Sequence, residues 1–178
     1  MNKYPTDYGN IVCYENDSCT VEALSKGKVT DQEIVENHLQ EYILKSDMIL
    51  DIGAHIGCHT IMYGKMNPNA NIYCFEPQPR FFSLLNENIK NNDIKNATIL
   101  NNAIGDSVKN VSMQSIVNQS KLDDMDFDDI EEYAEANAEV SMVTIDSLNL
   151  RGCDFIKIDV DSFDYEVGIN LYIAYHST

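Results

Sequence analysis

Apolar residues along the chain fall into short runs that alternate with segments of helical periodicity. Four runs predict β-strands: Met48–Ile52, Asn71–Phe75, Ala97–Leu100 and Asp154–Val160. Helices are predicted over Gly57–Met66 and from Pro79 onward, where Phe81, Phe82, Leu84, Leu85 and Ile89 form an apolar face. Strands that alternate with helices over such short intervals predict an α/β fold with a largely parallel sheet.

The first 45 residues have a different pattern. Residues 10–24 alternate loosely between apolar and polar, which predicts a short strand or hairpin. Thr30 and Glu33 have the spacing of a capping box, with Thr30 as the N-cap of a helix. The apolar stripe of that helix would be Ile34, Val35, His38, Leu39, Tyr42 and Ile43. We therefore expect residues 1–45 to pack as a hairpin and a helix on a core domain of residues 46–178.

Charge and composition exclude several classes of protein. The formal net charge is -17, and nine acidic residues fall in the segment 121–139, which we interpret as a solvated insert. Such a chain is not built to bind nucleic acid phosphates. No apolar run approaches the roughly 18 residues of a membrane span, and the N-terminus has no signal pattern. The five scattered cysteines form no CxxC pair. These features predict a cytoplasmic protein that interacts with neither membranes nor nucleic acids.

The candidate chemistry lies in the loop that follows the first predicted strand. The loop reads Asp51-Ile52-Gly53-Ala54-His55-Ile56-Gly57 and leads into a helix. Glycines in this position let a backbone approach a ligand closely, at the carboxyl ends of the strands where open α/β sheets bind nucleotides. Glu76 ends the next strand, at the spacing where an acid holds ribose hydroxyls. The combination predicts a site for S-adenosylmethionine (SAM), and we expect Glu76→Ala to abolish SAM binding with the fold intact.

Five blocks of sequence together resemble the FkbM family of SAM-dependent methyltransferases. The blocks are Ile49–Gly57, Tyr73–Pro77, Asn102–Asp106, Thr144–Leu148 and Ile156–Val160, and the resemblance covers roughly residues 9–167. It implies a Rossmann-like methyltransferase fold and, as in several members, methylation of a hydroxyl on a sugar or other small metabolite. The resemblance implies that Asp51, Gly53 and Gly57 contact the methionine end of SAM, and that Glu76 holds the ribose. It likewise implies that the turn from Asn102 to Asp106 lies beside the adenine and Asp159 near the methyl group.

The sequence departs from the family pattern in two places. The usual Asp-Val-Glu-Gly after the fourth strand is replaced by Asp159-Val160-Asp161-Ser162, which keeps an acid but shortens it. The chain also ends at Thr178, so the fold is expected to be truncated after the fourth strand. That strand would then form an exposed sheet edge, through which a homodimer could pair.

The expected reaction is direct attack of a substrate hydroxyl on the methyl group of SAM, with the enzyme aligning the reactants. Asp159 is the first candidate general base and Asp161 the second. His55 is counted with the cofactor-binding residues, although a packing role for His55 and His59 stays open. No metal site is expected, and Asp159, Asp161 and Asp164 are the one alternative set of oxygen ligands.

Two other functions compete with this interpretation. A nicotinamide-dependent oxidoreductase would have the loop G-x-G-x-x-G, which the segment from Gly53 to Gly57 does not match. A non-catalytic module that binds SAM or a protein partner is compatible with the short chain. The acceptor itself is not identified by the sequence.

Overall fold

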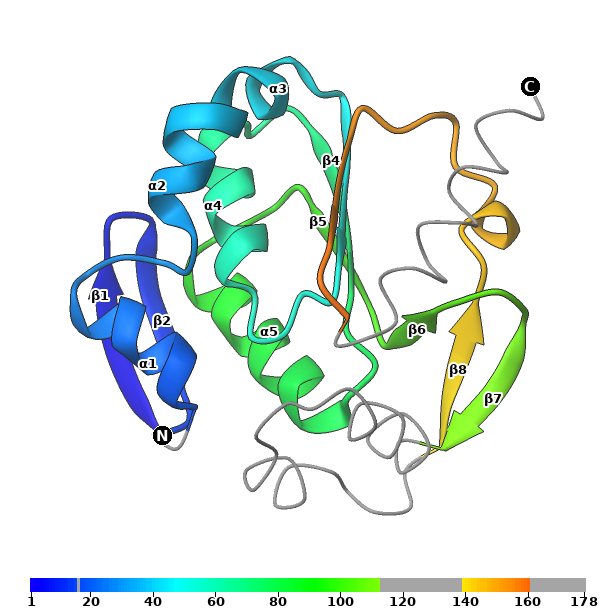
Figure 1. Cartoon of the computed structure of the whole chain (residues 1–178), viewed down its shortest axis with the longest axis horizontal. Coiled ribbons are helices and arrows are strands. Elements are labelled where there is room, and N and C mark those ends of the chain that lie inside the picture. Colours follow the sequence, from blue (N-terminus) through cyan, green and yellow to red (C-terminus); the bar gives the residue numbers. More distant parts are fainter. Residues whose placement is uncertain (16, 113–138, 161–178) are drawn as a thin grey trace.

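The architecture is a four-stranded parallel sheet with helices on one face and a small three-stranded sheet on the other (Figure 1). The computed structural model describes residues 1–15, 17–112 and 139–160. The parallel sheet has the order β5-β4-β3-β9, in which β3 is Met48–Ile52, β4 is Asn71–Phe75, β5 is Ala97–Leu100 and β9 is Phe155–Ile158. Helices α4 (Cys58–Met66) and α5 (Pro79–Asn91) connect the first three of these strands. The predicted α/β fold with four parallel strands is confirmed, and it is Rossmann-like.

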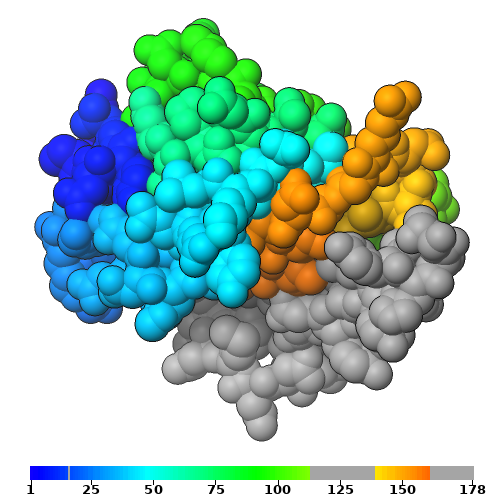
Figure 2. Space-filling view, turned by 90° about the horizontal axis from the view of Figure 1, so that it is seen from above, coloured from blue at the N-terminus to red at the C-terminus, as the bar shows by residue number. Residues whose placement is uncertain are grey.

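Each face of the parallel sheet has its own apolar core. Ile49 and Ile72 pack with α4 and α5, whereas Leu50, Ile52 and Phe75 face the opposite side. Parallel strands buried on both faces consist almost entirely of apolar residues, which is why the sequence revealed them. Figure 2 shows the carboxyl-terminal part of the described chain (orange) against the cyan surface, as the pairing of β3 with β9 requires.

The second sheet was not predicted. It has the order β6-β8-β7, with β6 at Asn102–Ile104, β7 at Lys109–Ser112 and β8 at Glu139–Val143. The expectation of a turn from Asn102 to Asp106 is wrong in its first half, because β6 pairs in parallel with β8. A 3₁₀ helix follows at Asp146–Leu148. The insert 121–139 lies outside the described residues except for Glu139, which begins β8.

The N-terminal region differs from the prediction in detail. The hairpin consists of β1 (Asn2–Thr6) and β2 (Gly9–Cys13), and it is followed by helix α1 (Ser18–Ser25), which was expected to be extended. Asp17 caps α1 by accepting a hydrogen bond from the Thr20 backbone N–H at 3.2 Å. This local side-chain bond favours helix at a point where the apolar pattern was ambiguous.

The second helical region is α2 (Gln32–Ile34), a π-helix (Val35–Leu39) and α3 (Gln40–Lys45). The Thr30 capping box is wrong, because the residue before α2 is Asp31 in the left-handed conformation with no side-chain cap. The predicted stripe is also too wide. Val35 and Ile43 are buried, but Ile34, His38 and Tyr42 are exposed.

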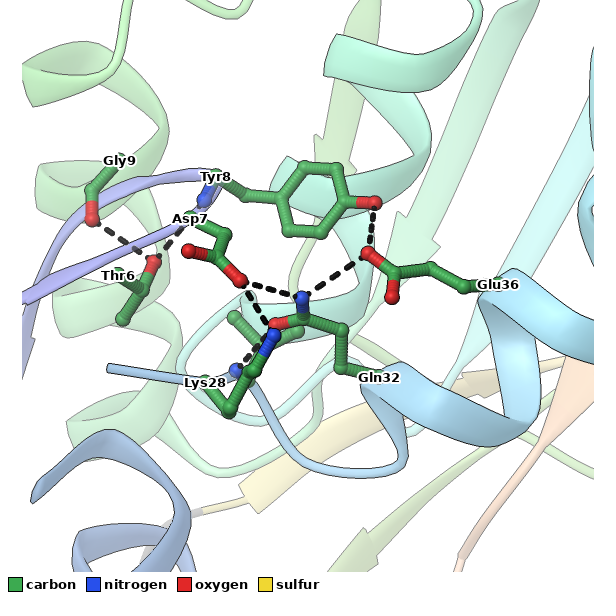
Figure 3. Close-up of polar contacts among 8 residues, drawn as sticks. Thr6, Asp7, Tyr8, Gly9, Lys28, Gln32 and Glu36 are labelled. Atoms are coloured by element: carbon green, nitrogen blue, oxygen red, sulfur yellow. Dashed lines mark hydrogen bonds and ion pairs between the residues drawn. The ribbon is translucent and has the colours of Figure 1, made fainter. Parts of the chain in front are cut away.

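Polar contacts tie the hairpin to this helical region (Figure 3). The buried amide of Gln32 donates to Asp7 Oδ2 at 2.8 Å and to Glu36 Oε1 at 3.0 Å. Tyr8 Oη donates to the same Glu36 oxygen at 2.8 Å. Burial, reinforced by this bond to a carboxylate, raises the pKa of Tyr8 to about 12. Gln32 thus turns inward and bridges two carboxylates, and its Oε1 accepts the Val29 N–H at 3.1 Å.

Two asparagines on α5 dock the hairpin against the core of the parallel sheet. The Asn88 amide exchanges hydrogen bonds with the N–H and C=O of Val12, at 2.8 and 2.9 Å. Asn92 does the same with Asn10, at 2.8 and 2.7 Å. The side chains are one helical turn apart, so they match alternate residues of β2. Residues 1–45 therefore share a core and a hydrogen-bond ladder with the rest of the chain.

We expect Asn92→Ala to destabilise the fold by about 1–3 kcal/mol, because it leaves the partly buried N–H and C=O of Asn10 without their partner. Thermal unfolding measures the loss. The neighbouring Asn91→Ala, on the exposed side of α5, is the control and should change stability by less than about 0.5 kcal/mol. Equal melting temperatures for both variants would contradict the docking role of Asn92.

Candidate cofactor site

The loop between β3 and α4 takes the conformation that its glycines permit. Gly53 has φ of 77° and Gly57 has φ of 92°, both in the left-handed region that side chains rarely adopt. The backbone N–H groups of Gly53 and Ala54 donate to the Phe75 carbonyl, at 3.0 and 2.9 Å. The loop is thereby held over the end of β4.

The chain itself needs both glycines, whatever ligand binds. A Cβ at Gly53 would lie 1.8 Å from the Asp159 carbonyl oxygen, and one at Gly57 would lie 2.6 Å from Leu85 Cδ1. The sequence predicts that these glycines let a ligand approach the backbone closely. The structure adds a second reason, the close packing of the loop on the end of β9 and on α5.

Glu76 follows β4 and points its carboxylate at the same loop. It is only 4% exposed, and Oε2 accepts the His55 backbone N–H at 2.9 Å while Oε1 accepts that of Gln78 at 2.8 Å. Asn101 fixes the turn from outside by donating to the carbonyls of Glu76 and Pro77, at 2.8 and 3.0 Å. The acid is thus held in place at the end of β4, facing the glycine loop.

An apolar pocket lies beside this turn, on the face of the sheet away from α4. The pocket is formed by the ends of β3 and β4, by β6 and β8, and by the residue after Asp159. The lining residues are Ile52, Gly53, Phe75, Pro77, Asn102, Ala103, Ile104, Met142 and Val160. Mostly apolar walls with a few polar groups are typical of small-molecule sites. Of the predicted site residues, Gly53 and Asn102 line the pocket. The Asn102 amide donates to the Ser141 carbonyl at 3.1 Å.

A cluster of charged side chains, Asp51, Lys157 and Asp159, lies at the same end of the parallel strands. Asp51 is fully buried, and its Oδ2 accepts the Thr60 hydroxyl at 2.6 Å. The ammonium of Lys157 lies 3.3 Å from Asp51 Oδ1 and 3.6 Å from Asp159 Oδ2. It also donates to the Gly53 carbonyl at 2.6 Å. Burial alone lowers the pKa of Lys157, but attraction to Asp51 and Asp159 outweighs it and holds that pKa above its ordinary value.

The two histidines of this region have different surroundings. The His55 ring packs edge-on against Phe81 at 4.1 Å, and its Nε2 lies 3.6 Å from Asp17 Oδ2. The His59 side chain is 12% exposed, and its Nε2 lies 3.8 Å from Asp31 Oδ2. Burial lowers the pKa of both rings, although the nearby carboxylates oppose it. Both rings are therefore harder to protonate than a free imidazole.

The depressed pKa of His59 predicts a loss of stability in mild acid. The unfolded chain binds a proton at about pH 6.5, whereas the folded chain binds it only at lower pH. The free energy of unfolding should therefore fall as the pH drops below about 6.5. Urea titrations of His59→Gln between pH 7 and 5 should show a shallower fall than wild type. The exposed His38→Gln is the control, and an unchanged slope in His59→Gln would refute this assignment.

Asp106 and Asp159, also predicted for the site, are not among the residues that line the pocket. Asp106 is on an exposed turn, where Ser107 and Lys109 donate to its carboxylate. Asp159 ends the described sheet with a side chain that is 68% exposed. Asp161, the second proposed base, lies outside the described residues, as does Asp164. Among residues 1–15, 17–112 and 139–160, no set of three His, Cys, Asp or Glu side chains is arranged to hold a metal ion.

Sequence reasoning overlooked three residues that organise the site: Thr60, Asn101 and Lys157. Lys157 had a detectable signal, because it is a charged residue inside the otherwise apolar strand β9. Thr60 and Asn101 gave no signal, since their importance depends on which atoms lie next to them.

The fold and the site define a Rossmann-like methyltransferase domain: a parallel sheet, a glycine loop after one central strand and an acid ending the next. The methyltransferase FkbM domain matches residues 51–167, which is more than half of the chain. The chain belongs to this family. No curated protein matches it.

Several solved methyltransferase structures match the chain at low similarity. The precorrin-6y C5,15-methyltransferase of Geobacter metallireducens is 17% identical with a TM-score of 0.34, and the match covers 68% of each chain. TYW2 of Pyrococcus horikoshii in complex with MeSAdo is 18% identical with a TM-score of 0.29. That match covers 46% of this chain but only 36% of TYW2, so the chain spans little more than a third of that structure.

Among the parts of the chain that the structure describes, no helix combines the length and the apolar character needed to cross a membrane.

Proposed function

We propose that the chain binds SAM across the carboxyl ends of β3 and β4 and transfers its methyl group to a hydroxyl of a sugar or another small metabolite. The buried Glu76 carboxylate carries the proposal, because it is held at a strand end by the N–H of His55, inside the glycine loop. A buried carboxylate is stabilised by the hydrogen bonds that it accepts, so a ligand that donates two hydroxyl groups would suit it.

Different residues of the site would contact different parts of SAM. The apolar pocket between Phe75, Ile104 and Met142 accommodates a flat purine. Glu76 accepts hydrogen bonds from the ribose, and the loop from Gly53 to Gly57 follows the methionine end. When bound, SAM supplies an activated methyl group. The protein aligns the acceptor oxygen with it, and Asp159, exposed at the end of β9, is the candidate to accept the hydroxyl proton.

Two further expectations belong to this proposal. All five cysteines are free, which agrees with a reducing cytoplasmic compartment. Among the described strands β9 lies at one edge of the parallel sheet, which is where a second copy would pair to form a homodimer. Measuring the solution mass of the purified chain tests the dimer.

Calorimetric titration of the purified chain with SAM, with NAD as the comparison ligand, tests the binding step. Incubation with SAM and a panel of hydroxylated acceptors, followed by mass spectrometry for S-adenosylhomocysteine, tests the transfer. Binding of SAM together with formation of S-adenosylhomocysteine supports the proposal. Binding without product for any acceptor supports a non-catalytic SAM-binding module, and absence of SAM binding refutes both.

A further inference from the structure

Lys157 occupies an unusual position in the parallel sheet. It lies in β9 directly opposite Asp51 of β3 in the strand register, and its side chain is only 15% exposed. Lysine is rarely buried to this degree unless it is paired. Its ammonium reaches two carboxylates and a backbone carbonyl, and these belong to both strands and to the glycine loop.

The three contacts make Lys157 the counter-charge of the loop. Asp51 is fully buried, and its Oδ1 has no hydrogen-bond partner among the described residues, so the ammonium 3.3 Å away balances its charge. Asp159 adds a second carboxylate at 3.6 Å. The two acids and one base therefore leave one unit of net negative charge directly beneath the Gly53 turn.

The net charge of this group matters because of the chemistry that the proposed function implies. SAM carries a positive sulfonium, whereas its product S-adenosylhomocysteine carries a neutral thioether, and the two molecules are otherwise alike. A charge beneath the loop therefore acts differently on substrate and product. Loosening of the loop, in contrast, weakens the binding of both molecules to the same extent, because they share the same adenosine and amino-acid groups.

We propose that Lys157 is a specificity-determining positioning residue: through its contacts with Asp51, Asp159 and the Gly53 carbonyl it sets how strongly the site prefers SAM over S-adenosylhomocysteine. The inference rests on the proposed function of the loop. Removing the ammonium adds one unit of negative charge to the site, so the preference for SAM should rise. Removing the Asp51 charge should lower it.

The test compares the ratio of the two dissociation constants, measured by calorimetry with SAM and with S-adenosylhomocysteine. Lys157→Met by itself leaves a bare buried carboxylate and can fail to fold. The decisive pair is therefore Asp51→Asn and the double variant Asp51→Asn/Lys157→Met, neither of which buries an unpaired Asp51 charge. From the first to the second, the ratio should shift toward SAM by about tenfold. Lys157→Arg, which keeps the charge, should retain the wild-type ratio.

A ratio that stays within about twofold across this pair, while wild type binds both molecules, overturns the role of Lys157 and leaves the proposed function standing. A shifted ratio that Lys157→Arg also shows would overturn it too, because the charge would not be the cause. If wild type binds neither molecule, the proposed function fails and this inference fails with it.

Discussion

Glu76→Gln is expected to weaken SAM binding by roughly 10- to 100-fold, since hydrogen bonds to a charged acceptor contribute about 1.5–3 kcal/mol each. Glutamine keeps one acceptor oxygen and nearly the same shape, but it carries no charge and replaces the other oxygen with a donor. The ribose hydroxyls would then meet an amide N–H where they need an acceptor. Calorimetric titration with SAM measures the change.

Glutamine is a milder probe than alanine, because Glu76 has a second task that the one oxygen of glutamine can still perform in part. Its two oxygens accept the backbone N–H groups of His55 and Gln78, so Glu76→Ala leaves both without a partner. We expect alanine to lower stability by about 2–4 kcal/mol in addition to its effect on binding. The sequence had suggested that the alanine variant would keep its fold intact, and these two bonds argue against that.

Glu87→Gln is the matched control, because Glu87 is exposed on α5 and undergoes the same loss of charge. Its SAM affinity should stay within about twofold of wild type. An unchanged affinity in Glu76→Gln would contradict the proposed ribose contact. The proposed function would then lose its main support.

Gly53→Ala is expected to be the most damaging small substitution in the loop. At φ of 77° the new methyl group would lie 1.8 Å from the Asp159 carbonyl oxygen, which is backbone and cannot rotate away. The strained conformation and the forced separation of the loop from β9 should together cost about 2–4 kcal/mol. For a chain of this size that lowers the melting temperature by roughly 5–15 °C. SAM affinity should fall as well, because the loop moves.

Gly27→Ala separates the two causes. Gly27 has nearly the same φ, 76°, but the nearest atom to its Cβ is Pro5 O at an ordinary contact distance of 3.8 Å. This variant should show only the conformational cost of about 1 kcal/mol, with unchanged SAM affinity. If the two alanine variants are equally stable, the close packing of Gly53 on β9 is not what requires a glycine there.

Much of the methyltransferase core was predictable because its signals are local. The strands β3, β4, β5 and β9 are short apolar runs, and α5 has a regular apolar face after Pro79. The second sheet was missed because β6 and β8 are separated by 34 residues, which include most of the acidic insert. The sequence of neither strand indicates which strand it pairs with. The apolar stripe of the N-terminal helix was predicted too wide. A π-helix interrupts this region and leaves only one row of the predicted apolar residues buried, and a π-helix has no clear sequence signal.

By itself the sequence determined the class of fold, the glycine loop and the acid at the end of the next strand, because residue type and spacing along the chain are enough to define them. Only the tertiary structure decided that Lys157 lies opposite Asp51, that Gly53 is pressed against Asp159, and that two asparagines of α5 hold the hairpin. Each of these depends on strand register or on side-chain direction between distant segments. Such contacts are set by the packing of the whole chain, and local propensity does not encode them.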